Sequence, residues 1–333
     1  EIASCLVGSE MCIRDRLSAA AYIAGWKITS KLPKPVAKAL FEWGADVASK
    51  KGKGPEQLRR NLARVVGPEN VTRELVRRSM RSYMRYWREA FQLPAMAGRE
   101  LAEELNRNFV PGSLELLHAS AESGRGTVIA LPHAGNWDMA GVWLVHHYGT
   151  FTTVAERLKP EILFEAFVEY REPLGFEIIA LTGADVPPLE RMEEVLREGG
   201  TVCLMGERDL TGHGVEVEFF GEKTSMPAGA ALLAQRTGAN LFTARVAFRG
   251  GSTDPRPERR GTPETWEHEV TPVEVEGRSL QQIVQQMADN FARGIAMDPQ
   301  DWHMLQPLWF ADLSEARRKR LGLGDENRTE GQD

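Results

Sequence analysis

The segment TVIALPHAGNWD places a histidine and an aspartate five residues apart, at the end of an apolar run. His133 closes a stretch of β-forming residues, and Asp138 follows it beyond a turn that contains Gly135. In α/β proteins, reactive side chains gather beyond the carboxyl ends of the strands. The spacing therefore predicts that Asp138 holds one nitrogen of the His133 imidazole while the other nitrogen faces a cleft as a general base.

A second apolar run, TVCLM, leads into the ionisable residues Glu207, Arg208 and Asp209. A carboxylate at the end of so apolar a strand needs a partner, because a buried charge is costly unless it is paired. His133 is the natural partner of Glu207. The sequence therefore predicts that these two strand ends lie close together.

The sequence also narrows the chemistry that such a base could perform. The chain has no GxSxG motif, so the nucleophile elbow of an α/β-hydrolase is not expected. The base would then activate a substrate hydroxyl or a water molecule. The histidines show no HxH or HxxxH spacing, and the pattern does not favour a metal site.

Predicted strands and helices alternate from about Gly124 onward and would position these groups. The predicted strands are 126–133, 151–157, 176–181, 200–207, 215–222, 241–248 and 266–275. The predicted helices are 160–174, 188–197, 227–238 and 279–296. Apolar strands that alternate with helices predict an α/β fold with a central mixed, largely parallel sheet, flanked by helices on both faces.

The charge of the chain is unevenly distributed. Residues 17–110, which are expected to be helical, carry 18 lysines and arginines against 9 aspartates and glutamates, whereas residues 111–333 carry 21 against 35. A basic segment on an acidic body favours an anionic surface, which could be nucleic acid or anionic lipid. No strand has an aromatic-plus-basic pattern that suggests nucleic-acid stacking, so we favour lipid.

One predicted helix, 73–91, combines an apolar face with a neighbouring basic stripe. The stripe consists of Arg77, Arg81, Arg85 and Arg88, and Trp87 lies near its boundary. An apolar face bordered by arginines is typical of a helix that lies on a membrane interface. The alternative is a helix packed in the core with a solvated basic edge.

The ends of the chain are expected to lie outside the folded body. Residues 1–16 contain MCIRDR, which resembles a translated sequencing adaptor, and they are predicted to be an artefact or a disordered extension. One domain is expected over 17–321, and 322–333 are expected to be a disordered tail. The apolar run at 19–26 is far shorter than the ~20 residues that a spanning helix needs. Outside residues 1–16 the sequence contains a single cysteine, Cys203, which fits a reducing compartment.

Five segments together resemble the lysophospholipid-type acyltransferases marked by an HxxxxD motif. Within that superfamily they are most similar to the branch that acylates phosphatidylinositol mannosides, a relative of the lipid A lauroyl-type enzymes. The segments are LPHAGNWDMAG (131–141), 154–178, MGERDLTGHGVEVEFFGE (205–222), 226–239 and DPQDWHMLQPLWF (298–310). HxxxxD alone is short, whereas the five segments in this order are specific. The resemblance covers roughly residues 20–320 and implies a glycerolphosphate-acyltransferase-like fold.

The resemblance also implies a reaction. A palmitoyl chain would pass from acyl-CoA to the 6-hydroxyl of mannose on phosphatidylinositol mono- or dimannoside, without an acyl-enzyme, a cofactor or a metal. His133 would remove the hydroxyl proton, Asp138 would stabilise the imidazolium, and Glu207 would complete the relay. Arg171 would organise the site together with Glu156. The expected setting is the cytoplasmic face of the plasma membrane, with peripheral binding to its anionic surface and no nucleic-acid partner.

The same resemblance suggests residues that contact the substrates. They are Arg157, Arg208, Asp209, Trp302, His303 and Gln306. The first two would meet phosphate groups, and the last three would lie on the acceptor side.

Three alternatives remain open. One is a lipid A type transferase that acylates KDO2-lipid IVA from acyl carrier protein. Enzymes of that branch usually carry a transmembrane anchor and an Asp-Gln-Asp variant where this chain has Glu207-Arg208-Asp209, so the sequence favours the mannoside branch. The second is a hydrolase that uses the His133 site to activate water. The third is a non-catalytic lipid-binding protein with the same fold.

Overall fold

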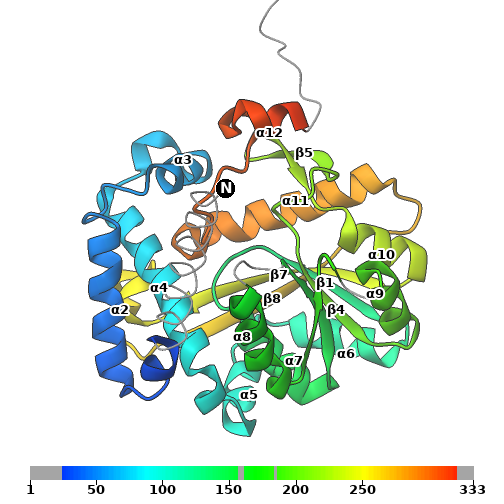
Figure 1. The fold of residues 1–333 in the computed structure, drawn as a ribbon, viewed down its shortest axis with the longest axis horizontal. Coiled ribbons are helices and arrows are strands. Elements are labelled where there is room, and N and C mark those ends of the chain that lie inside the picture. Colours follow the sequence, from blue (N-terminus) through cyan, green and yellow to red (C-terminus); the bar gives the residue numbers. More distant parts are fainter. Residues whose placement is uncertain (1–24, 157–160, 184–185, 321–333) are drawn as a thin grey trace, which may run out of the picture.

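A six-stranded sheet forms the centre of the computed structural model, which describes residues 25–156, 161–183 and 186–320 (Figure 1). The strand order is β3-β2-β4-β1-β7-β8, and β8 alone runs antiparallel to its neighbour. The strands are β1 (Thr127–Leu131), β2 (Phe151–Ala155), β3 (Phe176–Ala180), β4 (Thr201–Met205), β7 (Asn240–Arg249) and β8 (Thr265–Pro272). This confirms the predicted mixed, largely parallel sheet.

Helices cover both faces of the sheet, because strands such as β1 are buried on both sides. One face packs against α9 (Pro188–Arg197), α10 (Gly229–Thr237) and α11 (Leu280–Met297). The other packs against α4 (Arg73–Met96), α5 (Arg99–Asn106), α6 (Ser113–Glu122) and α7 (Trp137–Tyr148). The remaining longer helices are α2 (Lys34–Ala48), α3 (Glu56–Val66), α8 (Glu161–Arg171) and α12 (Glu315–Arg320).

The predicted strand 215–222 does not join the central sheet. It forms a hairpin in which β5 (Val215–Phe219) pairs with β6 (Glu222–Met226), a strand that the sequence analysis did not predict. β6 was not predicted because its sequence, EKTSM, is mostly polar. Its Thr224 is nevertheless fully buried, and its hydroxyl donates to the Leu308 carbonyl oxygen at 2.7 Å. Tertiary contacts therefore outweigh the weak local preference of this segment.

The prediction that the arginines of α4 face a membrane is wrong for Arg85 and Arg88. Their side chains are only 3% and 7% exposed. Arg85 Nε donates to Glu89 Oε1 at 2.7 Å, and Arg88 Nη2 donates to Glu264 Oε2 at 2.6 Å. Burial opposes ionisation of Glu264, but the two arginines outweigh it and lower the pKa of its carboxyl to about 2. These arginines fasten α4 to the loop before β8.

The other members of the stripe also make internal contacts. Arg77 and Arg81 each donate two hydrogen bonds to the carboxylate of Asp46, at 2.6 to 2.8 Å, and so join α4 to α2. Trp87 packs against Phe91 and lines a cavity. The basic edge of α4 is therefore an interface within the protein.

Residues 1–16 and 322–333 lie outside the described residues. Across residues 25–156, 161–183 and 186–320, none of the helices combines the length and the apolar character that crossing a bilayer requires.

Candidate active site

Two adjacent strand ends bring His133 and Glu207 together. β1 and β4 pair in parallel, with Leu131 opposite Met205 at their last residues. His133 and Glu207 each lie two residues beyond the end of their strand, so they lie side by side. Glu207 Oε1 lies 2.8 Å from His133 Nδ1 and accepts the His133 backbone N–H at 2.5 Å. Glu207 is fully buried, whereas the His133 side chain is 33% exposed. A carboxylate can only accept, so Nδ1 carries a proton, and Nε2 is the ring nitrogen that can take a proton from a substrate hydroxyl.

The predicted bond between Asp138 and His133 is replaced by a different ion pair. Asp138 accepts from Arg171 Nε at 3.0 Å and Nη2 at 2.7 Å, and from the Tyr86 hydroxyl at 3.3 Å. A guanidinium fork matches a carboxylate in two places, which favours this partner for a buried aspartate. Glu207 already occupies Nδ1 of the imidazole. The prediction that Asp138 hydrogen-bonds to His133 is therefore wrong, because Asp138 binds Arg171 and Glu207 binds His133.

Arg171 binds Asp138, and both Arg171 and Glu156, predicted to organise the site together, line the cavity described below. Its side chain is 5% exposed and stacks on the Phe167 ring at 3.6 Å. Burial alone would lower the pKa of Arg171, but the charge and hydrogen bonds of Asp138, together with the nearby Tyr86 and Tyr170, raise that pKa. Glu156 lies at the end of β2 and lines the cavity described below.

The turn that carries His133 is held by the segment after α11. The backbone N–H of Gly135 donates to the Asp301 carbonyl oxygen at 2.9 Å, and that of His303 donates to the His133 carbonyl oxygen at 2.8 Å. Gly135 has a φ of +60°, and a Cβ there would lie 2.3 Å from the Val246 carbonyl oxygen. Glycine is therefore required for the turn to pack against β7.

Asn136 then starts α7 and orients Asp138 in its first turn. Its side chain accepts from the Met139 backbone N–H and donates to Glu89 Oε2 at 2.9 Å. Trp266 Nε1 donates to the same Glu89 oxygen at 2.8 Å. Glu89 was not predicted from the sequence. Its position four residues after Arg85 in an arginine-rich helix could have indicated an ion pair between the two.

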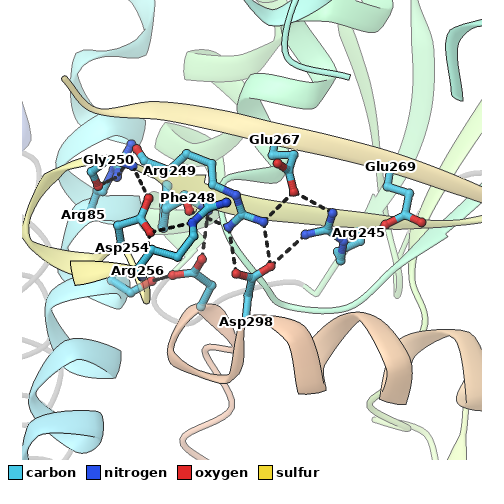
Figure 2. A network of polar contacts seen from close by, with 12 residues as sticks. Arg85, Arg245, Phe248, Arg249, Gly250, Asp254, Arg256, Glu267, Glu269 and Asp298 are labelled. Atoms are coloured by element: carbon cyan, nitrogen blue, oxygen red, sulfur yellow. Dashed lines mark hydrogen bonds and ion pairs between the residues drawn. The ribbon is translucent and has the colours of Figure 1, made fainter. Parts of the chain in front are cut away.

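A buried ionic network anchors the segment that holds this turn. Figure 2 shows Asp298 between Arg245 and Arg249 of β7. Arg245 Nη1 lies 2.7 Å from Asp298 Oδ2, and Arg249 Nη1 lies 2.7 Å from Oδ1. Three residues on, the Asp301 carboxylate accepts from the Ser82 hydroxyl and from the Phe248 backbone N–H. Burial and the charge of Asp298 raise the pKa of Asp301 to about 7.

The residues predicted to contact substrate separate into two groups. Arg208, His303 and Gln306 line the cavity. Trp302 does not, because it is fully buried against Phe219 and Trp309. That prediction is wrong for Trp302, whose large apolar ring fills the core.

Asp209 lines the cavity, but its carboxylate accepts from the backbone N–H groups of Thr211, Gly212 and Gly214 and from the Ser225 hydroxyl. It therefore shapes the loop after β4. Arg157 lies outside the described residues. The described residues contain no group of three or more histidine, cysteine, aspartate or glutamate side chains that could hold a metal.

The cavity has a volume of about 980 Å³ and a mostly apolar wall. His133, Asp138, Glu156 and Arg171 all line it. Much of the remaining wall comes from aromatic and aliphatic side chains of α4, α7 and the strands, including Phe91, Trp137, Trp143, Leu144, Phe151 and Phe176. A base that lines such a cavity can act on a substrate with a long hydrocarbon chain.

His268 on β8 also lines the cavity and gives a stability prediction. The ring is buried on Phe109, and within the described residues neither nitrogen has a hydrogen-bond partner. Burial, reinforced by Arg245, lowers the pKa of His268 from 6.5 to about 4. As the pH falls below 6.5, His268 becomes protonated in the unfolded chain but stays neutral in the native protein. The free energy of unfolding therefore decreases as the pH falls to about 4.

We expect His268→Phe to remove this contribution. Between pH 7.5 and pH 5 the variant should lose about 2 kcal/mol less unfolding free energy than the wild type. Urea denaturation at both pH values measures the difference. His146→Phe, which changes an exposed histidine of α7, is the control and should leave it unaltered. An unchanged pH dependence in His268→Phe would show that the buried imidazole is not the cause.

Comparison with known proteins finds one family model and several relatives that match most of this chain. Residues 11–310 match the model of the family described as bacterial lipid A biosynthesis acyltransferase. The chain is 52% identical over 304 residues to the phosphatidylinositol mannoside acyltransferase of Mycolicibacterium smegmatis, which covers 90% of this chain and 94% of that protein. It is 51% identical over 304 residues to the enzyme of the same name from Mycobacterium tuberculosis strain H37Rv, covering 90% and 91%.

Proposed function

Since this chain belongs to the bacterial lipid A biosynthesis acyltransferase family, we propose that it transfers a palmitoyl chain from acyl-CoA to the 6-hydroxyl of mannose in a phosphatidylinositol mannoside. The names of the two relatives described above support this acceptor. The observation that carries the proposal is the His133–Glu207 pair, with a free Nε2, at a large apolar cavity. Such a site combines a general base that can deprotonate a hydroxyl group with an apolar cavity that can hold an acyl chain.

The proposed reaction needs one proton shuttle and no covalent enzyme intermediate. His133 Nε2 takes the proton of the mannose hydroxyl as its oxygen attacks the thioester carbonyl carbon. The carbon–sulfur bond then breaks, and the imidazolium returns the proton to the departing thiolate. Glu207 accepts from Nδ1–H throughout and stabilises the transient imidazolium. The products are the mannose ester and free CoA thiol.

Positive charge beside the cavity supports a donor that carries phosphate. Arg208 Nε is buried and has no hydrogen-bond partner in the described part of the chain. Burial, followed by the nearby charge of Arg317, lowers the pKa of Arg208. An anion at this place would satisfy both cations. We assign Arg208 and Arg317 to the donor phosphates.

Polar residues near His133 support a sugar on the acceptor side. His303 and Gln306 line the cavity, and His303 Nε2 lies 3.0 Å from the Ser82 hydroxyl. Burial and the neighbouring His133 lower the pKa of His303 to about 3, so its ring is neutral at physiological pH. A neutral imidazole and an amide suit hydroxyl groups. We assign them to the mannose.

The direct test incubates the purified protein with radiolabelled palmitoyl-CoA and phosphatidylinositol dimannoside in mixed micelles. We expect labelled acylated mannoside, whose ester position is then read by mass spectrometry. Free palmitate as the sole labelled product would instead make the protein a hydrolase. Transfer to a lipid A precursor from acyl carrier protein, without transfer to the mannoside, would place it in the lipid A branch.

We also propose that α2, rather than α4, meets the membrane. Val36, Leu40, Trp43 and Val47 follow helical spacing along one face of α2, and each is 49 to 66% exposed. Lysines flank this face at positions 31, 34, 50, 51 and 53. Apolar side chains on one face with basic neighbours suit the surface of an anionic bilayer. This supports peripheral binding at the cytoplasmic face of the plasma membrane.

Trp43→Glu is expected to weaken binding to phosphatidylglycerol vesicles about tenfold or more, because it removes a large apolar side chain from the interface. Vesicle co-sedimentation measures the change. Leu116→Glu, which places the same charge at an exposed leucine of α6, is the matched control and should bind like the wild type. Equal weakening by both variants would show that α2 has no special part in binding.

A further inference from the structure

Ser82, in the middle of α4, links this helix to the segment that supports the His133 turn. Its side chain is fully buried. Its hydroxyl donates to Asp301 Oδ1 at 2.7 Å, and its oxygen lies 3.0 Å from His303 Nε2. One hydroxyl group of α4 therefore holds two side chains of a segment that lies more than two hundred residues further along the chain.

The chemistry of these three groups determines where their hydrogens lie. When it is ionised, the Asp301 carboxylate can only accept, so the hydroxyl hydrogen of Ser82 points to it. The Ser82 oxygen can then only accept from His303, so Nε2 of His303 carries the ring hydrogen and Nδ1 does not. Ser82 thus determines the tautomer of His303 as well as the position of its ring.

The backbone of the same two residues is bonded to the turn that carries His133. Asp301 accepts from the Gly135 N–H, and His303 donates to the His133 carbonyl oxygen. The residues between these contacts, Ala134 and Trp302, form an antiparallel bridge. Because Ser82 holds the side chains of Asp301 and His303, a shift of their segment would move the His133 turn and its imidazole relative to the cavity.

α4 is a firm support for such a contact because it is fastened on two sides. Figure 1 shows it between α2 and the central sheet. Just before Ser82, Arg81 donates two hydrogen bonds to Asp46 of α2. Just after it, Arg85 Nη2 donates to the Thr265 carbonyl oxygen at 2.8 Å, at the start of β8. The Ser82 hydroxyl therefore starts from a fixed point.

We propose that Ser82 is a positioning residue for the general base His133, because through Asp301 and His303 it fixes the turn that carries the imidazole. The described residues that form the cavity wall do not include Ser82, so its effect on the reaction passes through these two residues. This inference rests on the proposed acyl transfer and adds to it a residue that touches neither substrate.

Two buried serines of α4 provide matched variants. Ser82→Ala removes the hydroxyl that holds Asp301 and His303. Ser79→Ala is the control, because Ser79 is also buried and its hydroxyl has no hydrogen-bond partner within the described part of the chain. We expect S82A to lower kcat for palmitoyl transfer about 10- to 100-fold, since a small misplacement of a reacting group costs this much. The KM for palmitoyl-CoA should stay close to that of the wild type, and S79A should keep wild-type kcat.

The titration of Asp301 provides a second measure of this contact. Burial, and after it the charge of Asp298, raise the pKa of Asp301 to about 7. The hydrogen bonds from the Ser82 hydroxyl and the Phe248 N–H, and the charge of Arg249, act in the opposite direction. Loss of the Ser82 hydroxyl therefore raises the pKa of Asp301 further, so the carboxyl takes up its proton at a higher pH.

The pH dependence of kcat separates positioning from a general loss of stability. The acid limb of the profile should move to higher pH in S82A and stay in place in S79A. Two other groups near Asp301 do not change charge in this range. Arg78 of α4 stays protonated, and His303 stays neutral because its pKa is about 3. Protonation of His133 itself is common to all the variants.

A melting curve shows whether S82A is folded. If it is not, Ser82→Cys takes its place, because the thiol keeps the shape of the side chain and is a weaker donor, and kcat should fall with the same shift of the acid limb. Wild-type kcat in a folded S82A, or in S82C where S82A does not fold, would overturn the inference. A lower kcat with an unmoved acid limb would also overturn it, because the effect would not pass through Asp301. Either result, in a wild type that transfers palmitate, refutes only this inference. A wild type that acylates no acceptor refutes the proposed function itself.

Discussion

His133→Ala is expected to lower kcat for palmitoyl transfer by about 10²–10⁴-fold, the usual contribution of a positioned general base. His133 lies with Nδ1 held by Glu207 and Nε2 free at the cavity, so its loss leaves the acceptor hydroxyl without a proton acceptor. Initial rates at saturating donor and acceptor measure the effect. Because the histidine side chain is one-third exposed, its removal should leave the melting temperature close to that of the wild type.

Two comparisons make this result specific. His146→Ala changes an exposed histidine of α7 and should keep wild-type kcat. Glu207→Gln retains the shape of the buried partner but not its charge, and it should lower kcat with little change in KM, because the imidazolium exists only during the reaction. If His133→Ala transferred palmitate at the wild-type rate, His133 would not be the base.

Arg171→Met is expected to destabilise the protein by about 3–5 kcal/mol, since it leaves the buried Asp138 carboxylate without its cation. Asp138 is 3% exposed, and the two Arg171 hydrogen bonds supply most of its contacts. Urea unfolding at pH 7.5 measures the loss. Arg99→Met, which breaks the exposed Arg99–Glu103 pair of α5, is the matched control and should barely move the midpoint.

The double variant Arg171→Met/Asp138→Asn separates stability from catalysis. Removing the charge together with its partner should restore a large part of the lost stability, because no uncompensated ion remains. Activity should stay low, since Asp138 lines the cavity beside the base. A double variant as unstable as Arg171→Met alone would show that packing of the guanidinium, rather than its charge, is what α7 requires.

Local patterns in the sequence were sufficient for the fold class and for the central pair of the site. The runs that became β1 and β4 are apolar on both faces, which predicts buried parallel strands, and parallel neighbours end at one edge of the sheet. His133 and Glu207 each follow such a run, so both were predicted at this edge, and the pairing of β1 with β4 brings them into contact. Glycines and prolines likewise marked the bounds of α9 and α10 closely.

Only the tertiary structure decided which charge pairs with which. Asp138 could have bound His133, five residues away, but binds Arg171, which is 33 residues away and offers two hydrogen bonds. The arginines of α4 look like a solvated stripe along the helix, yet Arg85 and Arg88 are buried against glutamates. Spacing along one element determines which face a side chain occupies. The packing of distant elements determines what lies opposite that face.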